Sequence, residues 1–348
     1  MKNFAIYIVA LMMTSLFLMA SLSCNAQSVD ELQIKVKKLE AQNSALETKL
    51  KKCGKNSKNS ADQEKMIEYL NSENSRLNAE INAKNKADAD QAASDEAKKT
   101  MKLNIKDPVF KEYLMRYCDM DDDGVLTQWD ADHTYIIDIT RDKSVLKLMD
   151  GSNEVTSLDG IEHFVNLKKL VCSGNRIPQM DLSKNEQLQT LIANGCDLKL
   201  LNVSKNVELV HLECNNNLLY TIDLKSNTKL QKLDLYKNKM ATIDLSNCTQ
   251  LKTLMCAENT LTTLDVSKNT ALESINCSNN KLTELSFVNN EKLENIICNS
   301  NSLTNIDLQN GQNIKYLDCS KNKNLQYVVL SQGKRVHEDK KDTKTRYK

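Results

Sequence analysis

The residues with the clearest chemical pattern in this sequence lie between positions 119 and 130. Asp119, Asp121 and Asp123 alternate along one short segment, and Gly124 follows them directly. Carboxylates in the pattern D-x-D-x-D-G can converge on one hard cation, because the glycine permits the sharp turn that gathers them. The pattern predicts a Ca²⁺ loop. Its expected ligands are Asp119, Asp121, Asp123, the backbone carbonyl of Val125, Thr127 and Asp130.

The last position of this loop sets the affinity that we expect. Asp130 stands where a high-affinity EF-hand has glutamate. Aspartate is one methylene shorter and reaches a bidentate position less easily, so we expect a dissociation constant of about 10⁻⁴ to 10⁻³ M. The segment resembles a single dockerin-like calcium loop, which implies a structural ion in an N-terminal cap. An acidic turn without an ion is the alternative.

A repeat with a period of 21 residues dominates the chain between positions 167 and 330. Each copy has an apolar residue three positions after its first residue, a small or apolar residue at the fifth and, in seven copies, asparagine at the eighth. The eight copies open on Leu167, Leu188, Leu209, Leu230, Leu251, Leu272, Leu293 and Ile314. A unit this short cannot bury its apolar residues alone, so the copies must stack around a continuous core. The sequence predicts a mainly β leucine-rich-repeat solenoid, with one parallel strand per repeat, an extended or 3₁₀ return, and asparagines that bond backbone between coils.

Cysteine recurs at the fifth position of six predicted strands. These residues are Cys172, Cys214, Cys256, Cys277, Cys298 and Cys319. Free cysteine packs as a small hydrophobe, so we expect buried structural thiols, with disulfides or a metal as the alternative. The repeat, as in LESINCSNNKLTELSF, resembles the internalin-type bacterial leucine-rich repeats of the cysteine-ladder subfamily. This resemblance covers about half of the chain and implies a right-handed solenoid that binds protein.

The predicted strands place alternate side chains on the concave face of the solenoid. Charged and aromatic residues gather there in the middle repeats, and such residues are typical of recognition surfaces. The candidate partner-binding residues are His211, Glu213, Lys232, Asp234, Tyr236, Met255 and Tyr316. An ordinary polar sheet face without a ligand is the alternative.

Residues 1–26 are typical of an export signal. Lys2 precedes an apolar run from Phe4 to Ala20, and small residues follow it. The segment Ser21-Leu22-Ser23-Cys24 resembles a lipobox, which would make Cys24 the acylated membrane anchor of an outer-membrane lipoprotein that faces the cell surface. Cleavage after Ala26 is the alternative and would leave a secreted or periplasmic protein.

Residues 28–100 are predicted to form a helical coiled-coil stalk and linker. Apolar residues between Val29 and Cys53 alternate spacings of three and four, which is the coiled-coil pattern. Asn43 occupies an a position and favours a parallel homodimer. A second seam from Ile67 to Ile81 follows a break and is out of phase with the first. It could continue the stalk or fold back as a hairpin, and the pattern leaves both open.

Two shorter regions flank the repeats. Residues 104–166, which include the acidic loop, are expected to cap the first coil, because a solenoid needs a terminal unit with a polar outer face. Residues 331–348 leave the repeat and are rich in lysine and arginine. We expect them to form a frayed basic tail.

Composition and motifs exclude several function classes. The net charge of +1, without a basic aromatic patch, argues against nucleic acid as a partner. Nucleophile motifs, paired carboxylates beside histidine and phosphate-binding glycine loops are absent, so we expect no enzyme activity. The sequence predicts a binding protein of the bacterial cell envelope. It would present its concave face on the stalk to a protein or glycan, in adhesion or cell–cell contact. The alternative is a periplasm-facing scaffold or assembly factor that binds an envelope protein.

Overall fold

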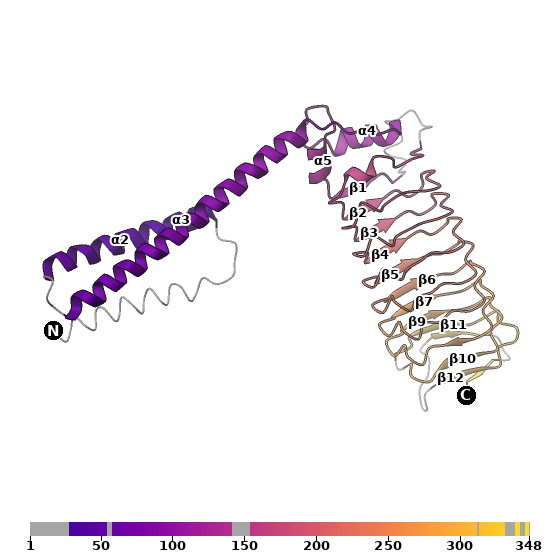
Figure 1. Ribbon diagram of the computed structural model, residues 1–348. Helices are drawn as coiled ribbons and strands as arrows, with labels where there is room; N and C mark the ends of the chain where they lie inside the picture. Colours follow the sequence, from indigo (N-terminus) through magenta and orange to yellow (C-terminus); the bar gives the residue numbers. More distant parts are fainter. Residues whose placement is uncertain are drawn as a thin grey trace. The chain divides into compact units, whose positions relative to one another are not determined.

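The computed structural model describes residues 28–53, 58–140, 154–311, 313–330, 338–341 and 345–347. The chain divides into two compact units, Met1–Glu96 and Ala97–Lys348, and each is described by itself (Figure 1). The predicted export signal and the predicted anchor residue Cys24 lie outside the described residues. Within the described ranges, no helix combines the length and the apolar character needed to cross a membrane.

The first unit is a pair of antiparallel helices. Helix α2 spans Val29–Cys53, and the long helix α3 spans Lys58–Lys99, with its last turn in the second unit. Each helix presents one apolar stripe, and the two stripes bury one another. The buried side chains are Leu32, Val36 and Leu39 of α2 and Leu70, Leu77 and Ile81 of α3. Figure 1 shows α2 lying beside the first part of α3.

The polar residue in this seam decides between the two predicted arrangements. Asn43 is buried, and its Nδ2 donates a hydrogen bond to Oδ1 of Asn71 in the same chain. The apolar seam is therefore used within one chain, which is the hairpin alternative, and homodimerisation stays a prediction. The hairpin is favoured because only four residues separate α2 from α3, and because in an antiparallel pair the two stripes need not share one heptad phase.

A helical cap begins the second unit. It contains α4 (Pro108–Tyr117), α5 (Gln128–His133), strand β1 (Ile136–Asp138) and a 3₁₀ turn, η1 (Ile161–His163). Asp107 caps α4 by accepting the N–H groups of Val109 and Phe110 at 3.0 and 2.9 Å. Its other carboxylate oxygen accepts the N–H and hydroxyl of Thr156. One buried carboxylate thus joins the helix to the loop that leads into the array.

The array itself is a parallel solenoid with a 21-residue period, as the sequence predicted. One ten-stranded parallel sheet runs in the order β1-β2-β3-β4-β5-β6-β7-β9-β11-β13. Its repeat strands are β2 (Lys169–Val171), β3 (Thr190–Ile192), β4 (His211–Glu213), β5 (Lys232–Asp234), β6 (Thr253–Met255), β7 (Ser274–Asn276), β9 (Asn295–Ile297) and β11 (Tyr316–Asp318). Equivalent residues pair in register, as Leu170 does with Leu191. The middle residue of each strand points into the core.

A second parallel sheet forms only on the return side of the last coils. It consists of β8 (Leu285–Ser286), β10 (Asn305–Leu308), β12 (Tyr327–Leu330) and β14 (Arg346–Tyr347), in the order β14-β12-β10-β8. Paired strands lie about 4.8 Å apart. The last coils therefore have paired backbone on both of their sides.

The fraying expected for residues 331–348 is not seen in residues 338–340 and 346–347, which form strands. Strand β13 (Glu338–Lys340) pairs in parallel with β11, and β14 pairs in parallel with β12. The terminal coil of a solenoid presents unpaired backbone N–H and C=O groups to the next segment, whatever its side chains. That backbone template extends both sheets by one strand, although the segment lacks the apolar repeat pattern.

Two asparagine ladders connect the coils, and the sequence predicted one of them. In the first ladder, Asn238 donates to the carbonyls of Cys214 and Leu235 and accepts the N–H of Leu219. The second ladder uses Asn185, Asn206, Asn227, Asn269 and Asn290, which are fully buried. Asn227, for example, donates to the carbonyls of Val203 and Asn206. Its signal was the same 21-residue spacing in a segment predicted only as an extended return.

Each repeat also has a residue with a left-handed backbone immediately after the sixth position, and the second repeat has another at Asp197. Those after the sixth position are Gly174, Gly195, Asn216, Lys237, Glu258, Asn279, Ser300 and Lys321. Side chains other than glycine and asparagine are strained in this conformation. The conformation is imposed because the N–H at this position bonds to the next coil, as Lys237 does to the carbonyl of Ala257 at 2.9 Å.

Candidate functional site

The middle of the concave face brings most of the predicted partner-binding residues together. Strands β4, β5 and β6 are adjacent, and their register aligns Glu213 with Asp234 and Asp234 with Met255. His211 aligns with Lys232 in the neighbouring row. Because alternate residues of a strand face the same side, these five side chains form one surface, which we call the central cluster together with Tyr236.

Polar contacts hold the central cluster in a defined arrangement. Lys232 Nζ lies 2.6 Å from Oε1 of Glu213. Asn215 donates a hydrogen bond of 2.8 Å to Oδ2 of Asp234, whose Oδ1 accepts the N–H of Tyr236. The cluster thus contains two carboxylates and one ammonium group, which gives its centre a net negative charge, while His211 is exposed beside it.

Glu258 belongs to this surface although the sequence did not indicate it. The hydroxyl of Tyr236 donates a hydrogen bond of 2.7 Å to Oε1 of Glu258, and this bond raises the pKa of the phenol. Glu258 is the left-handed residue of its repeat, with a φ of 52°. It follows the strand, outside the alternation that predicts outward side chains, so only the backbone conformation places it beside Tyr236.

Tyr316 lies apart from the central cluster. It is on β11, and β7 and β9 lie between β6 and β11 in the sheet. Three strand spacings correspond to about 14 Å. Lys340 of β13 lies over the Tyr316 ring, 5.7 Å from its centroid. Tyr316 is the first residue of β11 and pairs in register with Asn295 of β9, so it is separated from Asp234 by several strands and does not contact it.

The acidic loop gathers three of its predicted ligands. Carboxylate oxygens of Asp119, Asp121 and Asp123 lie within 4.8 Å of one another. Asp119 accepts the N–H groups of Asp123 and Gly124, and Gly124 has a φ of 79°. The turn therefore forms as the sequence pattern predicts, and its oxygen donors suit a hard cation such as Ca²⁺.

Asp130 and Thr127 have a different function from the predicted one in this structure. Asp130 is fully buried; its Oδ2 accepts the N–H and hydroxyl of Thr127 at 2.8 and 2.7 Å, and its Oδ1 accepts the N–H of Met120 at 2.9 Å. Together the two residues form the capping box of α5. Both oxygens of Asp130 are thus occupied by protein donors, and Asp130 is not among the three gathered carboxylates.

A lysine adjoins the acidic loop. Lys99 Nζ, at the end of α3, lies 3.1 Å from Oδ2 of Asp121 and 4.5 Å from the centroid of the Trp129 ring. A cation bound by Asp121 would compete with this ion pair. The sequence did not reveal the contact, because Lys99 lies in a segment predicted as a solvated linker.

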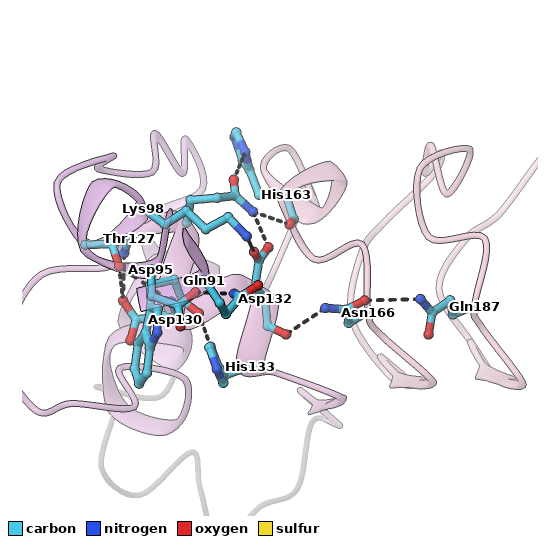
Figure 2. Close-up of polar contacts among 12 residues, drawn as sticks. Gln91, Asp95, Lys98, Thr127, Asp130, Asp132, His133, His163, Asn166 and Gln187 are labelled. Atoms are coloured by element: carbon cyan, nitrogen blue, oxygen red, sulfur yellow. Dashed lines mark hydrogen bonds and ion pairs between the residues drawn. The ribbon is translucent and has the colours of Figure 1, made fainter. Parts of the chain in front are cut away.

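A polar network ties the cap to the first coils of the array (Figure 2). Lys98 Nζ lies 2.6 Å from Oδ2 of Asp132, and Gln128 bridges Oδ1 of Asp132 to the carbonyl of His163. Asn166 donates to the carbonyl of Asp132, and Gln187 donates to Oδ1 of Asn166. Residues 166 and 187 are one period apart, so the network passes from the cap to two successive coils.

The six ladder cysteines are buried, as predicted, and the structure describes them as free thiols. Burial raises the pKa of Cys277 to about 12 and raises the pKa values of Cys256 and Cys298 well above the usual range. A thiol that stays protonated is a poor nucleophile and metal ligand. These three residues are therefore packing groups of the core.

Comparisons with known proteins identify the fold of the array. No protein-family model matches the chain, and no curated protein matches it. Among solved structures, the functional domain of InlJ from Listeria monocytogenes, described as including a cysteine ladder, is 26% identical, with a TM-score of 0.50. A leucine-rich-repeat protein of Leptospira interrogans is 16% identical, covering 63% of this chain and 72% of its own, with a TM-score of 0.46. The internalin InlF from Listeria monocytogenes is 17% identical, covering 69% and 94%, with a TM-score of 0.36.

The likeness to InlJ covers 64% of this chain and 54% of the InlJ domain, so the aligned part spans about half of that domain. The cysteine ladder named for InlJ has a counterpart in the buried cysteines at the fifth position of this array. The second unit of this chain is therefore a leucine-rich-repeat solenoid, similar in fold to the cysteine-ladder domain of InlJ.

Proposed function

We propose that this chain is a non-enzymatic binding protein whose protein partner docks on the concave face, over the central cluster. The observation that carries the proposal is the alignment of Glu213, Asp234 and Met255 on three adjacent strands, with Lys232 and Tyr236 beside them. Charged groups and an aromatic ring around an apolar side chain are the combination that concentrates binding energy at protein interfaces.

The contacts within the central cluster favour binding over catalysis. Glu213 is ion-paired with Lys232, and Asp234 accepts hydrogen bonds from Asn215 and Tyr236. A general base needs a carboxylate whose lone pairs are free to take a proton. In the central cluster these lone pairs are directed to fixed neighbours, so the surface is pre-organised, which reduces the entropy that a partner must overcome.

The net acidic centre of the cluster also defines the kind of partner. A basic side chain of the partner could approach Asp234 without displacing Lys232, since Lys232 is paired with Glu213 and Asp234 accepts its hydrogen bond from the neutral amide of Asn215. Electrostatic complementarity of this kind raises the association rate and gives specificity. We therefore expect a partner surface with a lysine or arginine at its centre.

Binding of the purified full chain to intact bacterial cells, measured by fluorescence, tests the proposed surface. Asp234→Ala combined with Tyr236→Ala should lower the apparent affinity by about 30-fold, the loss expected for one hot spot of about 2 kcal/mol. Glu208→Ala is the matched control, because Glu208 pairs with Lys229 at 2.6 Å outside the concave strands. Equal loss in both variants would contradict the proposed surface.

The cellular location is proposed from the export signal and the lipobox-like segment ending at Cys24. We place the protein at the bacterial cell envelope, anchored by lipid at Cys24 and facing the surface, where it would act in adhesion or cell–cell contact. Protease treatment of intact cells tests this. We expect the protease to cleave the array on wild-type cells. In Cys24→Ala cells we expect the protein to be released into the medium or retained inside the cell. Protection of the wild-type array until the outer membrane is opened would instead favour a periplasm-facing scaffold.

We also propose that Asp119, Asp121 and Asp123 hold a structural Ca²⁺. The three gathered carboxylates support this, and the ion pair of Asp121 with Lys99 indicates that affinity is modest. Calcium should raise the Tm of the full chain, and Asp121→Asn should abolish the rise. Asp122→Asn is the control, because Asp122 lies in the same turn outside the gathered group. A Tm that is unchanged by millimolar Ca²⁺ would exclude the site.

A further inference from the structure

Cys196 interrupts the repeat pattern, and its side chain lies next to Cys172 of the preceding coil. Seven repeats have asparagine at the eighth position, and the second repeat has Cys196 there instead. The same repeat has Ala193 where the ladder has cysteine. Leu170 and Val171 pair with Leu191 and Ile192, so Ala193 follows Cys172 in the ladder. The thiol that approaches Cys172 from the next coil therefore belongs to Cys196.

The geometry brings the thiol of Cys196 against Cys172. Cys196 Sγ lies 3.2 Å from the backbone carbonyl oxygen of Cys172, and the two neighbouring thiols shift the pKa of one another in opposite directions. Both residues are fully buried in the core. The backbone N–H groups of Asn175 and Gly174 lie close enough to the sulfur of Cys196 to favour its thiolate, although the N–H of Gly174 donates to the carbonyl of Asn194 at 2.8 Å. The sulfur of Cys196 thus occupies the place that an asparagine amide occupies in the other coils.

These contacts distinguish Cys196 from the remaining cysteines. The hydrogen bond from the Cys172 thiol, with the N–H groups of Asn175 and Gly174, lowers the pKa of Cys196 against the effect of burial. The same bond and burial raise the pKa of Cys172. In the ladder pair Cys256 and Cys277, burial raises both pKa values. A thiolate is the reactive form of cysteine, so the donors around Cys196 favour the nucleophile there.

We propose that Cys172 and Cys196 are a redox-active dithiol that closes to a disulfide between the first two coils of the array when a peroxide oxidises it. Hydrogen peroxide is small enough to reach a buried sulfur through local opening of one coil. The sulfur of Cys196 already touches the backbone of Cys172, and closing the disulfide requires the two sulfurs to approach to about 2 Å.

The reaction balances with one peroxide molecule. The sulfur of Cys196 attacks one oxygen of hydrogen peroxide, the O–O bond breaks, and the departing hydroxide takes the thiol proton to form water. Cys196 is then a sulfenic acid. The sulfur of Cys172 attacks the sulfur of Cys196, the S–O bond breaks, and the leaving hydroxide takes the Cys172 proton to form a second water. Two thiols are oxidised and one peroxide is reduced to two waters.

The disulfide would cross-link the two coils at the end of the array that adjoins the cap. Residues 172 and 196 belong to the two coils next to the cap, where Asn166 and Gln187 also connect successive coils. A cross-link here would remove the freedom of the first coil to separate from the second. Because a solenoid can unfold from its ends, oxidation should slow hydrogen exchange in residues 170–196 more than elsewhere.

Peptide mapping of the full-length protein tests the proposal. The native chain is treated with hydrogen peroxide, alkylated after denaturation and digested with trypsin. Wild type should yield peptide 170–176 joined to peptide 185–199, with two hydrogens fewer than their sum. The pair should be oxidised about tenfold faster than Cys256 and Cys277, in keeping with its greater thiolate character. Peroxide added to the denatured chain should lose this selectivity.

Two variants complete the test. Cys196→Asn restores the residue of the other repeats, and Cys172→Ala repeats the choice made at Ala193, so both should fold. Each should abolish the cross-linked peptide and the slowed exchange. Three results would overturn the proposal: recovery of Cys172 and Cys196 as free thiols, equal oxidation of Cys256 and Cys277, or arrest of Cys196 at an uncrosslinked oxidised form while Cys172 stays free.

Discussion

The two asparagine ladders look alike in sequence but should differ in their contribution to stability. Asn238, in the first ladder, makes three short hydrogen bonds: two from its Nδ2 to the carbonyls of Cys214 and Leu235, and one at its Oδ1 from the N–H of Leu219. A longer bond of 3.4 Å also joins its Nδ2 to the carbonyl of Tyr236. In Asn238→Ala the buried N–H of Leu219 loses the acceptor described for it. Three bonds at about 1 kcal/mol each, with a further penalty for the orphaned donor, predict a cost of about 3–5 kcal/mol.

The asparagines of the second ladder make fewer hydrogen bonds, so their loss should cost less stability. Asn227 donates to the carbonyls of Val203 and Asn206, which also accept the N–H groups of Asn206 and Leu209, so neither carbonyl is orphaned in Asn227→Ala. The Oδ1 of Asn227 is buried without a hydrogen-bond partner. Losing two bonds costs about 2 kcal/mol, and removing the unpaired oxygen returns about half of that, so we expect a net cost of about 1 kcal/mol.

Urea denaturation followed by circular dichroism measures the difference, with equal m-values required for the comparison. Hydrogen exchange at the amide of Leu219 supplies a local readout, because a solenoid need not unfold in two states. Asn227→Cys is the control, since Cys248 occupies the equivalent place one repeat later. Equal costs for Asn238→Ala and Asn227→Ala, or the reverse order, would refute the hydrogen-bond account of the two ladders.

Three further predictions follow from particular residues. Burial opposes the charge on Asp107, but hydrogen bonds from Phe110, Thr156 and Ser157 outweigh it and lower the pKa. The stability that this carboxylate contributes is therefore present above its ordinary pKa and is lost as the pH falls through the lowered pKa. The Tm difference between wild type and Asp107→Asn should therefore shrink on acidification, and a constant difference would contradict this. Lys237→Gly should stabilise the array by about 1 kcal/mol in urea denaturation by relieving the left-handed strain, whereas Lys237→Ala should not. Leu77→Asp should unfold the α2–α3 hairpin, which circular dichroism would show as a loss of helical signal. The wild-type chain should sediment as a monomer at micromolar concentration. A wild-type dimer that Leu77→Asp dissociates would instead support the intermolecular coiled coil.

The local patterns of the sequence were sufficient to predict the solenoid fold. A 21-residue spacing of apolar residues, with alternation inside each strand, determines which side chains enter the core, because stacking equivalent units is the one way to bury them all. The same alternation placed His211, Glu213, Lys232, Asp234 and Met255 on one face. The D-x-D-x-D-G pattern likewise determined the turn that gathers Asp119, Asp121 and Asp123.

Contacts between distant segments required the tertiary structure. Heptad spacing shows that a helix has an apolar stripe but not what covers it, and the pairing of Asn43 with Asn71 decided for the hairpin. The loop pattern assigned Asp130 to a metal, whereas burial beside Thr127 and Met120 occupies both of its oxygens. Strand β13 has no apolar pattern and follows a backbone edge that only the folded array provides. Local periodicity is a property of one segment, whereas these outcomes depend on which surface the fold brings opposite it.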